Sequence, residues 1–345
     1  MNDLAMTPGD QQRAPADAPP RETPSAAGVM DAAKRLAGVV MRTPMLESPV
    51  LNDRIGGRAL LKPEVLQHCG SFKFRGAYNR LSRLSEAEKA RGVVAWSSGN
   101  HAQGVALAAK RLGVQATIIM PKDAPALKIE RVKALGGEII LYDRYTEDRE
   151  AIGRALAGER NSVLVPSYDD RYIIEGQGTA ALELAEDAAR AGVALDALLV
   201  CCGGGGLTAG CALALSAISP QTEIIAVEPA GFDDTARSLA AGKRVSNNPS
   251  ARSICDAILT PTPGELTFDV MRKLRVGSAA VTDEQVLDAM AFAFKHLKLV
   301  VEPGGAVALT ALLSGAYDAS GKTVGVLLSG GNVEPAMFAR ALERI

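Results

Sequence analysis

A single lysine stands between two phenylalanines in the stretch C-G-S-F-K-F-R-G-A, residues 69–77. Because Phe72 and Phe74 alternate with polar residues, the local pattern could place the amine of Lys73 on a solvated surface. The same amine could instead be held in an apolar pocket, where burial lowers its pKa and makes it a usable nucleophile. The choice between these interpretations depends on which other residues surround Lys73.

A run of four glycines lies between the apolar segment 197–202 and a helix expected to begin near Leu207. Glycines at this point leave bare backbone N–H groups at a helix N-terminus, where the helix dipole also favours an anion such as phosphate. No Lys, Ser or Thr follows in the P-loop pattern, which disfavours a nucleoside triphosphate with Mg²⁺. The four residues are Gly203, Gly204, Gly205 and Gly206.

The glycine run also fits a second kind of ligand. Gly204, Gly206 and Ala209 match the G-x-G-x-x-A form of the dinucleotide-binding fingerprint. Glu228 follows at the end of the next expected strand, where an acidic residue would bind a ribose. A nicotinamide-dependent oxidoreductase is therefore a distant alternative.

Two polar turns follow other apolar segments: S-S-G-N-H at residues 97–101 and S-G-G-N at residues 329–332. A phosphate site, a lysine in apolar surroundings and polar glycine turns together favour pyridoxal 5′-phosphate. This cofactor needs an anion cradle, an amine that bonds it, a donor near its phenolic oxygen and a partner for its ring nitrogen.

Five motifs, in their order along the chain, resemble those of the threonine/serine dehydratase and serine racemase family. These are fold-type II pyridoxal-phosphate enzymes of the tryptophan synthase β-subunit superfamily. The resemblance runs from about residue 30 to the C-terminus. The motifs are G-S-F-K-F-R-G-A (70–77), S-S-G-N-H-A-Q-G (97–104), G-Q-G-T (176–179), G-G-G-G-L (203–207) and S-G-G-N (329–332).

The resemblance implies a role for each motif. Lys73 would bond the cofactor and act as the base at Cα, and Phe72 would lie beside the ring. Asn100 would donate to the phenolic oxygen, and Ser329 would meet the pyridine nitrogen. The phosphate would be held by the backbone N–H groups of Gly203, Gly204, Gly205, Gly206 and Leu207. The substrate carboxylate would bind the loop formed by Ser97, Ser98, Gly99, Asn100 and His101.

The implied reaction is α,β-elimination from threonine or serine, which yields a 2-oxo acid and ammonia. A hydroxyl partner for the ring nitrogen makes the cofactor a weaker electron sink, which suits loss of a β-leaving group. Ser98 would serve as the second acid/base in a serine or aspartate racemase, which is one alternative, and 3-hydroxyaspartate dehydratase is another.

Cys69 and S-I-C-D-A (253–257) depart from the commoner threonine and T-I-A-D-G of the family, which weakens the case for threonine itself. Glu302 resembles a family position near the pyridine ring, or is a turn residue.

A divalent-cation site is also implied by the resemblance. Glu228 and Asp234 would be side-chain ligands, and Phe232 would offer its carbonyl oxygen. Hard oxygen ligands of this kind suit Mg²⁺ or Ca²⁺. The alternative is an ordinary helix start at which aspartates cap the backbone.

Short apolar segments alternate with amphipathic ones from residue 92 onward, a pattern typical of parallel sheets covered by helices on both faces. Ligands of such sheets bind at the carboxyl ends of the strands, where the polar turns lie. The expected strands are 93–96, 116–121, 138–143, 162–167, 197–202, 223–229 and 323–332. The expected helices are 101–111, 125–135, 147–157, 172–190 and 207–217.

The chain is predicted to be a two-lobed α/β enzyme of fold type II. Residues 1–27 are rich in Pro, Ala, Asp and Gln without an apolar period, and we expect them to be a disordered tail. A large cofactor-binding domain is expected from residues 30–91 and 170–345. A small domain from residues 92–169 would be inserted in it.

The bulk composition limits the partners of this 345-residue chain. Its formal net charge of −1 disfavours nucleic acid and anionic membranes. It has no apolar run long enough to span a bilayer and no secretory signal. Its five cysteines, in no zinc-site spacing, favour a reducing cytoplasm. The resemblance implies a homodimer, and because the segment after Asn332 is short, we expect no C-terminal regulatory domain.

Overall fold

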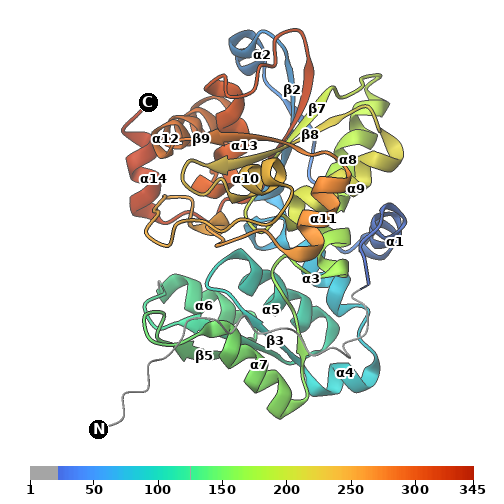
Figure 1. Cartoon of the computed structure of the whole chain (residues 1–345), viewed down its shortest axis with the longest axis vertical. Coiled ribbons are helices and arrows are strands. Elements are labelled where there is room, and N and C mark those ends of the chain that lie inside the picture. The colour runs from blue at the N-terminus through green and yellow to red at the C-terminus, as the bar shows by residue number, and fades with distance from the viewer. Residues whose placement is uncertain (1–21, 125) are drawn as a thin grey trace.

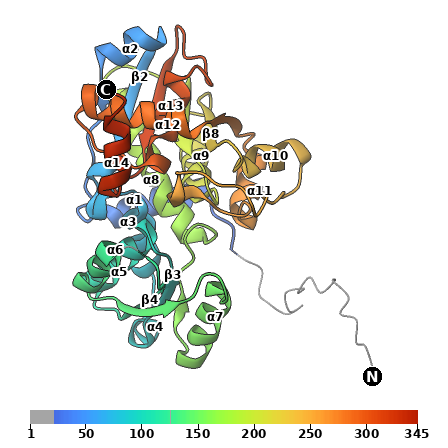
Figure 2. The same ribbon diagram turned by 90° about the vertical axis from the view of Figure 1, so that its left-hand side faces the viewer.

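Two sheets organise the computed structural model, in which residues 22–124 and 126–345 are described. Each sheet has helices packed around it, and the two sheets form two lobes (Figures 1 and 2). The six-stranded sheet has the order β1 (Leu46–Glu47), β2 (Arg58–Pro63), β10 (Thr323–Leu328), β7 (Ala197–Cys201), β8 (Glu223–Pro229) and β9 (Gly277–Val281). The four-stranded sheet has the order β5 (Glu138–Tyr142), β4 (Ala116–Pro121), β3 (Val93–Trp96) and β6 (Val163–Leu164).

The strands of both sheets run parallel, apart from the antiparallel pair β1–β2. The predicted α/β class with parallel sheets is therefore confirmed. The helices of the first half are α1 (Ala26–Leu36), α2 (Pro49–Ile55), α3 (Lys73–Leu81), α4 (Glu86–Arg91), α5 (Asn100–Leu112), α6 (Ala126–Ala134), α7 (Arg149–Arg160) and α8 (Arg171–Arg190). Those of the second half are α9 (Gly206–Ile218), α10 (Asp234–Ala241), α11 (Glu265–Lys273), α12 (Asp283–Phe292), α13 (Pro303–Leu313) and α14 (Pro335–Leu342).

The central strand β7 shows why the sheets form as they do. All five of its residues, A-L-L-V-C, are buried, because helices cover both faces of the sheet. Some helices begin at side-chain caps: Asp170 accepts hydrogen bonds from the N–H groups of Tyr172 and Ile173 at the start of α8. Such a cap fixes where the loop before its helix ends, whereas α5 and α9 begin at Gly99 and Gly205 without a side-chain cap.

The helix α3, which carries Lys73, joins the two lobes. Its residues Phe74, Ala77 and Leu81 belong to the apolar core around the four-stranded sheet. Its opposite side contacts α8, which packs against the six-stranded sheet. The predicted lobe boundary at residue 92 stays a prediction, although α3 precedes it along the chain and packs in the smaller core.

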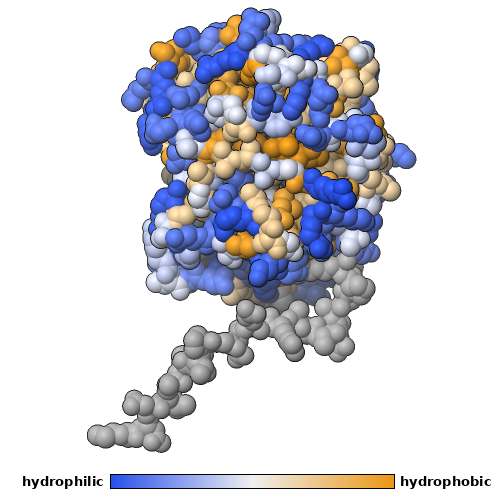
Figure 3. Space-filling view, turned by 45° about the horizontal axis from the view of Figure 1, so that its top comes forward, coloured by the Kyte–Doolittle hydropathy of each residue, from blue (hydrophilic) through white to orange (hydrophobic). Residues whose placement is uncertain are grey.

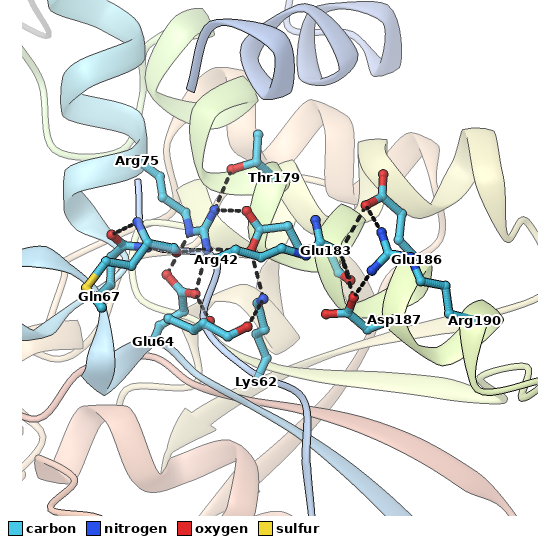
Figure 4. A network of polar contacts seen from close by, with 12 residues as sticks. Arg42, Lys62, Glu64, Gln67, Arg75, Thr179, Glu183, Glu186, Asp187 and Arg190 are labelled. Atoms are coloured by element: carbon cyan, nitrogen blue, oxygen red, sulfur yellow. Dashed lines mark hydrogen bonds and ion pairs between the residues drawn. The ribbon is translucent and has the colours of Figure 1, made fainter. Parts of the chain in front are cut away.

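A buried polar network anchors the face of α3 that is turned towards the larger lobe (Figure 4). The guanidinium of Arg75 is fully buried and donates to both carboxylate oxygens of Glu64, at 2.7 and 2.8 Å. It also donates to both oxygens of Glu183, at 2.7 and 2.9 Å. Lys62 completes the network, since its Nζ donates to Glu183 at 2.7 Å.

Several expected boundaries differ from the structure. The strand expected at 162–167 covers only Val163–Leu164, because Pro166 has no N–H group with which to extend the ladder. The disordered tail was expected to reach residue 27, whereas α1 already begins at Ala26, capped by the Ser25 hydroxyl. Residues 1–21 of the expected tail lie outside the described residues. The strands β1, β2 and β9 were not predicted, and the homodimer stays a prediction.

The side of the molecule seen in Figure 3 is covered mainly by hydrophilic side chains, with hydrophobic ones gathered near its middle. Among the residues that the structure describes, no helix is both long and apolar enough to cross a membrane.

Candidate active site

One pocket lies where the carboxyl ends of the two sheets meet. It is lined by residues that follow β3 and β6 of the smaller sheet and β7 and β10 of the larger one. This is the position at which parallel α/β sheets bind ligands. All the residues predicted for cofactor and substrate line it: Phe72, Lys73, Ser97, Ser98, Gly99, Asn100, His101, Gly203, Gly204, Gly205, Gly206, Leu207 and Ser329. Their individual roles stay predictions.

Lys73 is the first residue of α3, and its side chain reaches into this pocket. Its Nζ donates to the carbonyl oxygen of Ser167 at 2.8 Å and lies 5.1 Å from the centre of the Phe72 ring. Burial lowers the pKa of Lys73 to about 8, although the neighbouring Cys201 and Glu302 oppose the shift. An appreciable share of the amine is therefore uncharged under mildly basic conditions, as a nucleophile or base requires.

The glycine run forms the N-terminus of α9. Gly205 is its N-cap, in the left-handed conformation with φ of 89°, which favours glycine. A Cβ added to Gly204 would lie 2.4 Å from the ring of Tyr168, so a side chain there would clash. Within residues 22–124 and 126–345, the N–H groups of Gly203, Gly204 and Gly205 donate no hydrogen bond. Unpaired N–H groups at a helix N-terminus fit the phosphate of the predicted cofactor.

Asn100 is held by Glu302, the N-cap of α13, and by Asn332, which follows β10. Its Nδ2 donates to Glu302 Oε1 at 2.5 Å, and its Oδ1 accepts from Asn332 Nδ2 at 2.7 Å. One amide hydrogen of Asn100 is left to donate into the pocket. Burial raises the pKa of Glu302 to about 7, which the hydrogen bond from Asn100 partly opposes. The sequence allowed two interpretations of Glu302, a turn residue or a residue of the site. In the structure Glu302 lines the pocket.

The serine-rich loop precedes α5 and presents several polar groups. The hydroxyl of Ser97 accepts from the N–H of Gly99 at 3.1 Å, whereas the Ser98 hydroxyl has no hydrogen-bond partner among the described residues. His101 is buried, and burial together with the nearby Lys73 lowers its pKa to about 3. Its neutral ring therefore donates from Nε2 to the carbonyl oxygen of Val165 at 2.9 Å. The Nδ1 atom is a buried acceptor with no partner in the described part of the chain.

Sequence reasoning missed several residues that line the pocket, among them Lys128, Arg149, Tyr168 and Cys201. Arg149 lies in the charged run D-R-Y-T-E-D-R-E (143–150), which resembles an ordinary solvated surface. One signal could have singled it out: an arginine in the first turn of a helix is disfavoured by the helix dipole. Cys201 ends an apolar strand and looked like a small buried hydrophobe.

The residues predicted to bind a metal lie outside this pocket. Glu228 caps α10, since its two oxygens accept from the N–H groups of Thr235 and Ala236, each at 2.9 Å. Asp234 Oδ1 accepts from Asn247 at 2.6 Å, while Oδ2 is buried without a partner in the part of the chain that the structure describes. Phe232 is half-buried in the turn before them. No group of three or more His, Cys, Asp or Glu among the described residues could hold a metal ion.

A lysine of lowered pKa and an anion cradle in one cleft between parallel α/β lobes are typical of enzymes that bind a phosphorylated aldehyde cofactor. The family described as pyridoxal-phosphate dependent enzyme matches residues 36–330. The chain therefore belongs to the fold-type II pyridoxal-phosphate-dependent enzymes, and the family predicted from its motifs is confirmed.

Individual relatives share this family but differ in their named activities. An L-threo-3-hydroxyaspartate ammonia-lyase of Saccharomyces cerevisiae is 44% identical over 316 residues, which cover 92% of this chain and 95% of the yeast protein. A serine racemase of Schizosaccharomyces pombe is 39% identical and covers 92% of this chain and 96% of its own length. The crystal structure of a T.th. threonine deaminase superposes with a TM-score of 0.84 at 44% identity, covering 90% of this chain and 99% of that one.

Proposed function

We propose that this chain is a pyridoxal-phosphate-dependent ammonia-lyase that removes water from a small β-hydroxy amino acid. The observation that supports it best is that Lys73, with its pKa lowered to about 8, shares one pocket with the unpaired N–H groups of the glycine run. Ammonia-lyases are among the relatives that match most of the chain. The products would be a 2-oxo acid and ammonia.

The chemistry divides between the cofactor and the protein. When bound, the cofactor supplies an electron sink for the electron pair left at the substrate Cα. Gly203, Gly204, Gly205, Gly206 and Leu207 would hold its phosphate, and Asn100 and Ser329 would contact its ring. The amine of Lys73 would accept the proton from Cα, because burial keeps a share of it uncharged. The hydroxyls of Ser97 and Ser98 and the N-terminus of α5 would bind and orient the substrate carboxylate.

The charged groups that line the pocket are three cations and three carboxyl groups, Glu150, Asp256 and Glu302, and their pairing leaves one cation for a second carboxylate of the substrate. Besides Lys73, the pocket is lined by two cations, and Lys128 is paired with Asp256 at 3.3 Å. Arg149 is exposed and makes no hydrogen bond or ion pair within the described residues. The adjacent Glu150 is instead paired with Arg154 at 2.7 Å. Arg149 is thus the cation left to bind a carboxylate of the substrate, and we propose 3-hydroxyaspartate ahead of threonine and serine.

Substitution of Arg149 tests this assignment. In Arg149→Met, kcat/KM for 3-hydroxyaspartate should fall about 10- to 100-fold, because one charge-assisted hydrogen bond to the substrate is lost. The kcat/KM values for threonine and serine should change less than about threefold, since those substrates have no second carboxylate. The measurement is 2-oxo acid formation from each amino acid and each stereoisomer.

Arg149→Lys is the matched control, since it keeps the charge and should retain an intermediate rate. Equal losses for all three substrates in Arg149→Met would contradict a role in side-chain recognition. A wild-type enzyme faster on threonine than on 3-hydroxyaspartate would restore threonine as the preferred substrate.

Racemisation is the second candidate, and the free hydroxyl of Ser98 is the observation that favours it. A racemase needs an acid/base group opposite Lys73, and Ser98 could supply a proton there. Chiral chromatography of the unreacted amino acid from the same assays distinguishes the two reactions. A lyase leaves the starting enantiomer, whereas a racemase yields its mirror image.

A divalent cation beside α10 belongs to the same proposal. Burial raises the pKa of Glu228 to about 8 and that of Asp234 to about 6, and a cation bound between them would favour their charged forms. The unpartnered Oδ2 of Asp234 is the atom that would bind Mg²⁺ or Ca²⁺.

We expect Mg²⁺ or Ca²⁺ at about a hundredfold excess over its Kd to raise the Tm by about 5 °C, and EDTA to reverse the shift. Asp234→Asn should abolish the metal effect. Asp233→Asn is the control, because Asp233 is half-exposed and already paired with Arg237 at 3.0 Å. Unchanged melting with and without metal would leave Glu228 as a helix-capping residue and Asp234 as the acceptor of the Asn247 hydrogen bond only.

A further inference from the structure

Cys201 and Ser329 lie at the ends of two neighbouring strands. Cys201 is the last residue of β7, and Ser329 directly follows β10, which runs parallel to β7. Both residues line the pocket, yet both are almost entirely buried, with 3% and 4% of their surface exposed. Their side chains therefore meet at the floor of the site and not at its entrance.

The two side chains are joined by a hydrogen bond. Cys201 Sγ donates to Ser329 Oγ, with 3.0 Å between the two atoms. Burial raises the pKa of the Cys201 thiol to about 11, so the thiol keeps its proton near neutral pH and can act as the donor. A hydroxyl that accepts one hydrogen bond still has its own hydrogen to donate elsewhere.

The main chain of Ser329 is already fixed on both sides. Its carbonyl oxygen accepts from the N–H of Phe72 at 3.1 Å, and its own N–H donates to Gly305 at 3.4 Å. The hydroxyl hydrogen of Ser329 can still rotate about the Cβ–Oγ bond. Because the thiol donates to Oγ, the hydroxyl hydrogen is turned away from sulfur, and the open direction is the pocket.

We propose that Cys201 is a positioning residue that orients the Ser329 hydroxyl as a hydrogen-bond donor towards the ring nitrogen of the cofactor. The inference rests on the proposed function, in which Ser329 is the partner of that nitrogen. It assigns a role to a thiol that the sequence pattern presents as a small buried hydrophobe. The neighbouring Cys202 does not line the pocket, since its Sγ lies 3.3 Å from Thr235 Oγ1.

A double-mutant cycle in the holoenzyme tests the proposal with Cys201→Ala, Ser329→Ala and the double variant. Two quantities are measured: the visible absorption spectrum of the bound cofactor as a function of pH, and kcat and KM. Cys201→Ala should shift the pH midpoint of the spectrum in the same direction as Ser329→Ala. It should lower kcat about three- to tenfold, the worth of one neutral hydrogen bond, with KM changed less than about twofold. The double variant should match Ser329→Ala alone, because Cys201 acts through Ser329.

Two further variants separate orientation from packing. Cys201→Ser keeps a donor of similar size and should restore most of the wild-type spectrum and rate. Cys202→Ala removes the adjacent thiol and should leave both unchanged. A Cys201→Ala effect that persists at full size in the Ser329→Ala background would overturn the proposal, as would a spectral shift of the same size in Cys202→Ala.

Failure of the inference and failure of the proposed function give different results. If Ser329→Ala shifts the spectrum while Cys201→Ala does not, the positioning role is wrong and the lyase assignment stands. If the wild-type protein binds the cofactor but releases no 2-oxo acid from any β-hydroxy amino acid, the lyase assignment fails. The spectral cycle still decides the role of Cys201 in that case.

Discussion

Lys73→Ala should give a colourless protein with at least about a thousandfold less activity. The loss is large because one amine would do two tasks, bonding the cofactor and accepting the proton from Cα. The environment of Lys73 supports both: it is close to the Phe72 ring, and burial lowers its pKa to about 8. The measurements are the visible absorbance of the purified protein, peptide mapping after borohydride reduction, and the rate of 2-oxo acid formation.

Lys128→Ala is the matched control, because Lys128 is another lysine that lines the same pocket. Its ammonium is paired with Asp256 at 3.3 Å and with Glu334 at 3.8 Å, so it is not available to bond a carbonyl carbon. This variant should stay yellow, and borohydride should still label the peptide that contains Lys73. A yellow Lys73→Ala protein, labelled at another lysine, would show that the assignment of Lys73 is wrong.

Some residues of the pocket could be predicted from the sequence because residues of their type, in that pattern, have few other roles in a protein. Four consecutive glycines after an apolar strand have few explanations besides a ligand that approaches the backbone, and these glycines line the pocket. The motifs at 203–207 and 329–332 follow neighbouring strands of one sheet, so the sequence was enough to predict that these two would meet at its carboxyl edge. The class of fold followed from the same alternation of strands and helices.

Other residues could not be predicted, because their role depends on the order of the strands. The hydrogen bond from Cys201 to Ser329 spans 128 positions of the chain and exists only because β7 and β10 are neighbours. The edge strands β1 and β9 were missed since both are only partly buried, so they lack the continuous apolar run of a central strand. Arg149 was missed because a charged segment resembles solvated surface whether or not one of its side chains borders a pocket.

Arg75→Met should destabilise the protein by about 3–5 kcal/mol, which is a large share of the stability of a typical domain. The side chain of Arg75 is fully buried and its guanidinium joins Glu64 and Glu183 (Figure 4). Methionine fills a similar volume but leaves Glu64 buried without its cation, while Lys62 still neutralises Glu183. The measurement is the free energy of unfolding from urea denaturation.

Arg58→Met is the control for the loss of an arginine as such, since the Arg58–Glu47 pair has the same short contact, 2.8 Å, on the surface. It should leave the free energy of unfolding almost unchanged, because water already solvates both charges. Arg75→Lys should lie between the two, because one ammonium cannot match the paired hydrogen bonds of the guanidinium to two carboxylates.

The double variant Arg75→Met/Glu64→Gln identifies the cause of the loss. If the buried carboxylate is what destabilises Arg75→Met, neutralising Glu64 should restore about 1–3 kcal/mol. If the double variant is less stable still, the two losses add, and packing around the arginine stem is responsible instead of charge. Arg75 lies two residues after Lys73 on α3, so the same network that stabilises the fold also holds the base of the proposed reaction in place.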